Sequence, residues 1–358
     1  MAPTSPVYLL RIADWKDLEH VAKALRRLLA ETPLLQAARP GRPAAIKLTF
    51  GEEGNTAHPP VPLVREVVAA LRQREARPFL TETCTLYHGR RRNALDHLEL
   101  ARDHGFTPEA VGAPIILGDG LLGRESYAFH LKGPQVKIAH LVPTLRDTGF
   151  LVGLAHVTGH LLTGYGGALK NIGMGLATRS GKLDMHSAVS PTVRADKCTL
   201  CLECVSVCAA EAITPGNEAV AIDGARCTGC AECLAVCPTG ALGIHWSQDS
   251  RRVQEKMAEY ALAVARVMDN RLAFINLLNH ISDHCDCMGA TPNCICPDIG
   301  IAASADPVAL DQACLDLVAA AAGRDVFRQA WPEVDKEAQL EHAEAVGLGQ
   351  RAYELLEI

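Results

Sequence analysis

Twelve of the fourteen cysteines in this 358-residue chain fall into two groups whose spacing suits metal binding. The first group lies between residues 198 and 238 and contains the spacing C-x2-C-x2-C-x3-C twice. Three cysteines so spaced wrap one corner of an iron–sulfur cube, and the fourth reaches the other cube. The pattern therefore predicts two [4Fe–4S] clusters. One set of ligands is Cys198, Cys201, Cys204 and Cys237, and the other is Cys208, Cys227, Cys230 and Cys233.

Zinc and disulfides are the alternatives for these eight cysteines. Zinc needs only four ligands and usually takes them from paired knuckles, not triplets. Disulfides belong to oxidising compartments, and the amino terminus lacks the charged-then-apolar layout of an export signal. We therefore expect a cytoplasmic protein with reduced, metal-binding thiols. Ala209 replaces the proline that usually follows the fourth cysteine, a position that supplies no ligand.

A second group of cysteines lies in HCDCMGATPNCIC, where two C-x-C pairs stand beside Asp283, His284 and Asp286. Four soft ligands in one loop predict a third metal centre, either an iron–sulfur cluster or a zinc ion. Free thiols, with one redox-active pair among them, are the alternative. The predicted ligands are Cys285, Cys287, Cys294 and Cys296.

A stretch rich in histidine and glycine, AHVTGHLLTGYGGALKNIGMG, precedes the cysteines. On a helix, His156 and His160 would share one face, since they are four residues apart. Imidazoles bind metals or transfer protons, and a buried lysine acts as a base or nucleophile. Helix capping and ordinary ion pairs are the alternatives for each residue alone. We predict catalytic roles for His156, His160, Lys170 and His186.

Residues suited to holding a cofactor or an anion occur in the same stretch and near the amino terminus. Glycines let backbone approach a ligand closely, and an amide or ammonium group can bind it. The side chains of Arg90, Arg91 and Arg92 are also suited to binding an anion. The alternative is that they are a run of charges exposed to solvent. The predicted cofactor-binding residues are Lys47, Gly166, Gly167 and Asn171.

Bulk composition narrows the class of protein. The net charge of −6, without a long basic run, gives no indication of nucleic-acid binding. No apolar run is long enough to span a membrane. We expect a redox donor or acceptor protein as partner, a small-molecule substrate and a possible homo-oligomer.

Strand and helix patterns alternate along the chain on both sides of the cysteine segment. Apolar strands such as 45–50, 150–155 and 272–278 alternate with helices such as 18–29, 61–74, 250–268 and 307–322. The tail from residue 335 reads as helical, with a break at Gly347–Gly349. The pattern predicts an α/β domain in two parts, 1–192 and 248–358, with an inserted module at 193–247.

Several of these motifs resemble known families. Residues 194–246 resemble the bacterial two-cluster ferredoxins. IKLTFGEEGN, GYGGALKNIGMG and HCDCMG…PDIGIAASADPVALDQA resemble the family catalogued as domain of unknown function 362, many of whose members carry an inserted ferredoxin. The order His160, Lys170, His186 is also similar to the nickel-pincer lactate racemases, although His58 stands where their substrate motif has arginine. These resemblances imply a lactate-racemase-like α/β fold with an inserted α+β, ferredoxin-like 2[4Fe–4S] module.

The function expected from these features is electron transfer coupled to redox chemistry, as in an iron–sulfur oxidoreductase. Two clusters would feed electrons to a cleft that contains the histidines, Lys170 and the second cysteine group. A non-enzymatic electron carrier or cluster scaffold is one alternative. A nickel-pincer-type racemase or hydride-transfer enzyme, with a cofactor attached to Lys170, is another.

Overall fold

The computed structural model describes residues 4–12, 14–186, 190–244, 249–289 and 293–358. An eight-stranded sheet has the order β16-β1-β15-β14-β7-β2-β3-β4, and only β15 runs against its neighbours. Its strands are β1 (Ser5–Arg11), β2 (Pro43–Lys47), β3 (Arg77–Glu82), β4 (Ile115–Leu117), β7 (Phe150–His156), β14 (Leu272–Leu278), β15 (Gly300–Ser304) and β16 (Tyr353–Glu357). The predicted α/β class is confirmed.

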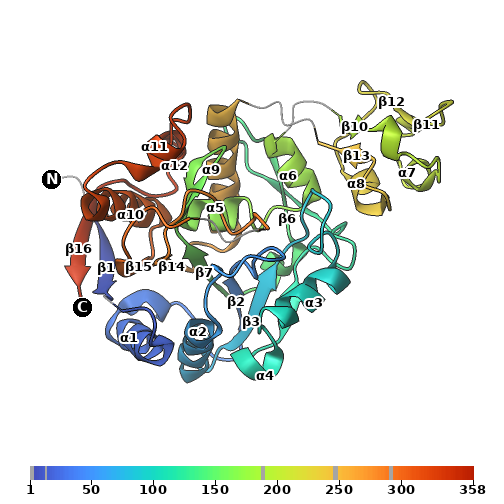
Figure 1. The fold of residues 1–358 in the computed structure, drawn as a ribbon. Coiled ribbons are helices and arrows are strands. Elements are labelled where there is room, and N and C mark those ends of the chain that lie inside the picture. Colours follow the sequence, from blue (N-terminus) through green and yellow to red (C-terminus); the bar gives the residue numbers. More distant parts are fainter. Residues whose placement is uncertain (1–3, 13, 187–189, 245–248, 290–292) are drawn as a thin grey trace.

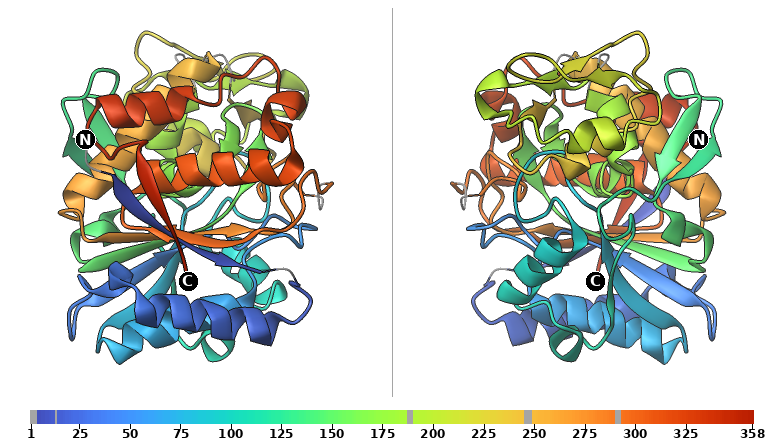
Figure 2. Two further views of the ribbon diagram at one scale, coloured as in Figure 1. Left: turned by 90° about the vertical axis from the view of Figure 1, so that its left-hand side faces the viewer. Right: turned by 90° about the vertical axis from the view of Figure 1, so that its right-hand side faces the viewer.

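Helices cover both faces of this sheet, as Figures 1 and 2 show. One face packs against α1 (Leu18–Glu31), α2 (Val61–Gln73) and α4 (Pro108–Val111) in a single apolar core. The other face packs against α5 (Ala168–Gly173), α9 (Ser250–Val267), α10 (Pro307–Ala322) and α12 (Ala338–Ala345). Every residue of β7 and β14 is buried, which explains their continuous apolar sequences.

Shorter elements complete the α/β part. They are α3 (Ala94–Asp103), β5 (Tyr127–His130), β6 (Ile138–Leu141), β8 (Thr158–His160), β9 (Gly164–Gly166), α6 (Arg179–His186) and α11 (Val326–Ala330). Short 3₁₀ turns lie at Pro33–Leu35, Pro143–Arg146 and Ala195–Lys197. Among the described residues, no helix combines the length and apolar character needed to cross a membrane.

The structure corrects three expectations. His156 ends β7 and His160 ends β8, so the two histidines do not share a helix face. The chain beyond Gly347 forms β16, which pairs with β1, because extending the sheet satisfies its backbone and packs Leu355. Sequence patterns also gave no strand at 300–304, where the short run GIAAS forms β15.

The cysteine segment, drawn in yellow-green to yellow at the upper right of Figure 1, has its own small elements. They are β10 (Thr192–Val193), α7 (Glu203–Ser206), β11 (Ile213–Thr214), β12 (Ala221–Ile222), α8 (Glu232–Val236) and β13 (Leu242–Gly243). Strand β10 pairs with β13, and β11 pairs with β12. The segment has a separate apolar cluster, in which Leu86 and Leu183 of the α/β part also take part.

A buried carboxylate connects the glycine-rich turn to the sheet. Asp311 of α10 accepts hydrogen bonds from the backbone N–H groups of Ala168 and Leu169, at 2.8 and 2.9 Å. The side-chain amide of Asn276 on β14 donates a third bond, at 2.8 Å. These bonds satisfy the first N–H groups of α5 and set where that helix begins.

Replacing Asp311 with asparagine tests this role. The Asp311→Asn variant turns an amide group toward donors, so we expect a loss of about 2–3 kcal/mol in the free energy of unfolding. Urea unfolding measures this loss, with the exposed Asp147→Asn variant as the matched control. Equal stability of the two variants would contradict the assignment.

Candidate functional site

Two separate hollows in the cysteine segment are each lined by four cysteines. Cys198, Cys201, Cys204 and Cys237 line one hollow, together with apolar residues such as Leu202 and Leu242. The other hollow is lined by Cys208, Cys227, Cys230 and Cys233. In each hollow, three thiols come from one half of the segment and the fourth comes from the other half.

The two halves repeat one backbone conformation. Cys198 and Cys227 lie 29 positions apart, as do Cys208 and Cys237. At the same offset, three pairs of residues have left-handed backbone, with φ between 49° and 70°. Four of those six positions stand next to a cysteine, and four of the six are not glycine. Such strained positions persist where tertiary structure holds a site together. The pairs are Leu200 with Gly229, Leu202 with Ala231, and Glu211 with Gly240.

The chemistry of these thiols suits an iron–sulfur cluster. A cube is held by four thiolates, and each hollow offers four sulfurs with an apolar surround. The set of four sulfur donors in each hollow therefore fits the expected group.

A cavity of about 680 Å³ lies at the carboxyl-terminal edge of the parallel strands. Lys47, Glu82 and His156, the last residues of β2, β3 and β7, all line it. This edge is where open α/β sheets place their ligands. Ten predicted site residues meet here: Lys47, His156, His160, Gly166, Gly167, Lys170, Asn171, His186, Cys285 and Cys287.

Ion pairs fix one wall of the cavity. The Lys47 ammonium lies 2.8 Å from the Glu82 carboxylate, and both side chains are buried. Arg91 donates to Glu52 at 3.0 Å and lies 3.8 Å from Glu82. Desolvation lowers the pKa of Lys47, although Glu82 opposes the shift. Asn171 accepts from the Lys47 ammonium at 3.2 Å, so it supports the lysine.

His156 has both ring nitrogens engaged. Nδ1 lies 3.0 Å from the Asp286 carboxylate, and Nε2 lies 2.6 Å from the carbonyl oxygen of Asn279. Both partners are acceptors, so the ring is held as an imidazolium. Burial lowers the pKa of His156, but the charge of Asp286 reverses the effect and the pKa is raised. These contacts hold His156 against Asp286 in the wall of the cavity.

His160, Lys170 and His186 face a common part of the cavity. Burial holds the pKa of His160 well below its usual range, with Lys170 and His186 adding to the shift. Burial also lowers the pKa of His186 to about 3, and Lys170 again contributes. The pKa of Lys170 falls to about 8, chiefly through desolvation. Near neutral pH the Lys170 amine can therefore exchange protons with a ligand, while burial keeps the two imidazoles neutral.

Two glycines allow Lys170 to reach the cavity. A Cβ atom at Gly166 would lie 2.9 Å from Cδ of Lys170. A Cβ atom at Gly167 would collide with the carboxylate of Asp311. The GYGG turn thus needs glycine because side chains occupy the adjacent space.

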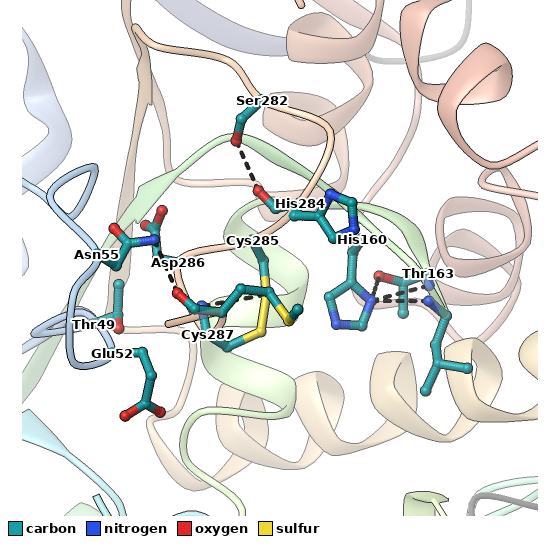
Figure 3. Close-up of a disulfide and its surroundings, with 12 residues drawn as sticks. Thr49, Glu52, Asn55, His160, Thr163, Ser282, His284, Cys285, Asp286 and Cys287 are labelled. Carbon is teal, nitrogen blue, oxygen red and sulfur yellow. Dashed lines mark hydrogen bonds between the residues drawn. A yellow bond between two sulfur atoms is a disulfide. The ribbon is translucent and has the colours of Figure 1, made fainter. Parts of the chain in front are cut away.

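The second cysteine group divides in two. Cys285 and Cys287 are joined by a disulfide and line the cavity beside His160 (Figure 3). The thiol of Cys294 instead lies 3.2 Å from the carbonyl of Cys296, and that of Cys296 lies 3.7 Å from the carbonyl of Val318. Of the four expected ligands, only Cys285 and Cys287 belong to a compact group of ligand atoms among the described residues, so the structure does not bring all four around one ion.

Several cavity residues escaped the sequence patterns. Glu82, Tyr87 and Lys182 line the cavity, but they come from a strand end, a loop and a helix without a motif. Lys182 donates to the hydroxyl of Thr83 at 2.5 Å and to the carbonyl of Cys84 at 2.6 Å. Only the position of Glu82 at the end of an apolar strand could have indicated its role.

The lowered pKa of Lys170 predicts unusual reactivity. Near pH 8 about half of the Lys170 amine is neutral, against well under 1% for an ordinary lysine. Carbamylation by cyanate, followed by peptide mass spectrometry across pH 6–11, should show a half-maximal rate near pH 8 for Lys170. The exposed Lys23 serves as the comparison in the same digest, and identical profiles for the two lysines would contradict the shift.

Two solved structures are similar to this chain over part of their length. The lactate racemase apoprotein from Thermoanaerobacterium thermosaccharolyticum aligns with 76% of this chain at 13% identity and a TM-score of 0.40. A Thermotoga maritima protein of known structure aligns with 91% at 8% identity and a TM-score of 0.39. The chain spans 50% and 59% of their respective lengths. No curated protein matches it.

The family model described as "Domain of unknown function (DUF362)" matches residues 44–316. That range includes the cysteine segment and every predicted site residue. The chain is therefore a member of the DUF362 family.

Proposed function

We propose that this chain is an iron–sulfur redox protein in which the cysteine segment delivers electrons to the cavity in the α/β part. The observation that carries the proposal is the sorting of eight cysteines into two hollows of four, by the crossed pattern that their spacing predicts. In this proposal residues 193–247 form a module inserted into the α/β domain. Bound [4Fe–4S] clusters would supply single electrons.

One loop connects the two sites. Leu86 lines the cavity and also packs in the apolar cluster that contains Cys233 and Cys237. A few residues further, Arg92 donates to the carbonyl oxygen of Cys237 at 3.4 Å. The loop between β3 and α3 thus contacts both the cavity and a predicted cluster ligand, which supports a short path between them.

The cavity suits a small anionic substrate. Its lining includes the cations Lys47, Arg91, Lys170 and Lys182 against the carboxylates Glu82 and Asp286. In the proposed role, Lys47 and Arg91 stay paired and set the electrostatic field, while Lys170 transfers protons. A redox partner protein would dock where Cys201 and Cys230 are exposed. A reducing compartment such as the cytoplasm would keep these thiols available.

A covalent pincer-type cofactor on Lys170 is a second candidate. The observation that favours it is the placement of Lys170, with its lowered pKa, beside His160 and His186. A racemase or hydride-transfer enzyme would then use the same cavity. An adduct on Lys170 in the intact-mass spectrum would support this candidate over simple proton transfer.

Iron content tests the cluster assignment. Protein purified without oxygen should contain about eight irons and eight sulfides per chain. The Cys208→Ser, Cys230→Ser double variant should retain about four irons, since both residues line one hollow. The Cys208→Ser, Cys204→Ser variant should lose both clusters. The crossed assignment would be refuted if the first variant lost both clusters while the second kept one, or if the Cys84→Ala control lost iron.

The connecting loop predicts an effect on reduction potential. Arg92→Gln removes a positive charge beside Cys237, so one of two midpoint potentials should become more negative. A spectroscopic redox titration measures both centres. Arg65→Gln, which affects a surface pair with Glu19, should change neither. Equal shifts of both centres, or no shift, would argue against the contact.

A further inference from the structure

His160, Cys285 and Cys287 form a compact set of metal-binding atoms. One ligand atom from each residue lies within 4.8 Å of the others, and it is the one such group of three found among the described residues. His160 and Cys285 are buried, and all three side chains line the cavity. Two thiolates and an imidazole are soft ligands that suit zinc, nickel or cobalt.

Local bonds hold the two ligand segments together. The backbone N–H of Gly159 donates to the carbonyl of Ser282 at 2.7 Å, which joins β8 to the cysteine loop. The indole of Trp331 donates to the carbonyl of Asp283 at 2.8 Å. The loop is therefore positioned from both sides before Cys285 enters the cavity.

Thr163 can set the tautomer of His160, whose ring lies between Thr163 and the two sulfurs in Figure 3. The Thr163 hydroxyl donates to the carbonyl of Tyr165 at 2.7 Å, so its lone pair faces Nδ1 of His160 at 3.0 Å. Nδ1–H can donate to this oxygen, which frees the lone pair of Nε2. In the metal-free structure the backbone N–H groups of Leu162 and Thr163 donate to Nδ1, each at 3.2 Å, so the proton sits on Nε2. Binding of a metal ion at Nε2 moves this proton to Nδ1, where the Thr163 oxygen accepts it.

We propose that His160, Cys285 and Cys287 bind one divalent transition-metal ion, such as zinc, and leave a coordination position open to the cavity. Three protein ligands with an open fourth position are the arrangement of catalytic zinc sites. The inference deepens the proposed function by giving the cavity its own reaction centre, and it rests on that proposal for the redox role alone. Lys170 lines the same cavity and would face the exchangeable ligand.

The disulfide makes this site dependent on reduction. A dithiol reductant converts the Cys285–Cys287 disulfide into two thiols, with two electrons and two protons transferred, and itself becomes a disulfide. Metal binding then displaces the two thiol protons. The oxidised form offers His160 alone and should not hold the ion.

Metal titration of the iron-loaded protein tests the site. The reduced protein, freed of adventitious metal by a mild chelator, should bind one Zn²⁺ per chain in competition with a chromophoric chelator. Zinc-edge X-ray absorption should report two sulfurs and at least one nitrogen. The protein kept as the disulfide should bind no zinc, and equal binding by both forms would overturn the dependence on reduction.

Variants locate the ligands. Cys285→Ser, Cys287→Ser and His160→Gln should each weaken zinc binding by roughly 100-fold or more, and Thr163→Val by about 10–100-fold. The Cys294→Ser, Cys296→Ser double variant is the matched control and should bind as tightly as the parent protein. Loss of binding in this control, with retention in Cys285→Ser and Cys287→Ser, would overturn the assignment.

Iron content, measured on the same samples, separates this inference from the proposed function. Unchanged iron and unchanged circular dichroism in the variants show that folding and the cysteine segment are intact. Zinc binding in a protein without clusters would leave the metal site standing and refute the cluster proposal. Iron–sulfur clusters in a protein that binds no zinc would refute the metal site and leave the cluster proposal standing.

Discussion

The buried carboxylate of Asp311 is the interaction on which the cavity depends. It accepts hydrogen bonds from the first N–H groups of α5 and from Asn276 on β14. One side chain of α10 therefore connects α5, which carries Lys170, to the central sheet. Desolvation raises the pKa of Asp311 to about 6, against the effect of its three donors. The position of Lys170, one turn into α5, follows from this contact and from the absence of side chains at Gly166 and Gly167.

The reversed direction of β15 explains how the second cysteine group reaches the cavity. Strand β14 ends at the edge where Lys47, Glu82 and His156 lie, and the chain must return to begin β15. Because β15 runs antiparallel to β14, the connection stays at this same edge. Asp286 then pairs with His156, which places Cys285 and Cys287 on the cavity side. A parallel crossover would have carried the loop to the far edge of the sheet.

The cysteine segment repeats itself more closely in backbone than in sequence. Non-glycine residues at Leu200, Leu202 and Ala231 adopt left-handed conformations at matching positions. Each costs conformational energy in isolation, so the surrounding cysteines and apolar cluster must hold them. The contact of Leu86 with that cluster attaches the segment to the cavity wall rather than to a distant surface. One short loop thereby contacts both the cysteine segment and the cavity.

The sequence alone determined the features that depend on local spacing. Three such features follow from residues close together in the chain. They are the spacing of the cysteine triplets, the apolar runs of β7 and β14, and the limits of α10. Family membership was also readable from contiguous motifs, and the family match confirms it. The roles predicted for the histidines and Lys170 remain proposals.

Tertiary structure decided which groups meet across long separations. It paired His156 with Asp286, grouped His160 with Cys285 and Cys287, and brought Glu82 and Lys182 into the cavity. It also turned the tail into β16, since strand pairing depends on an open sheet edge and not on local propensity. These outcomes depend on burial and partner geometry, which a linear pattern does not contain.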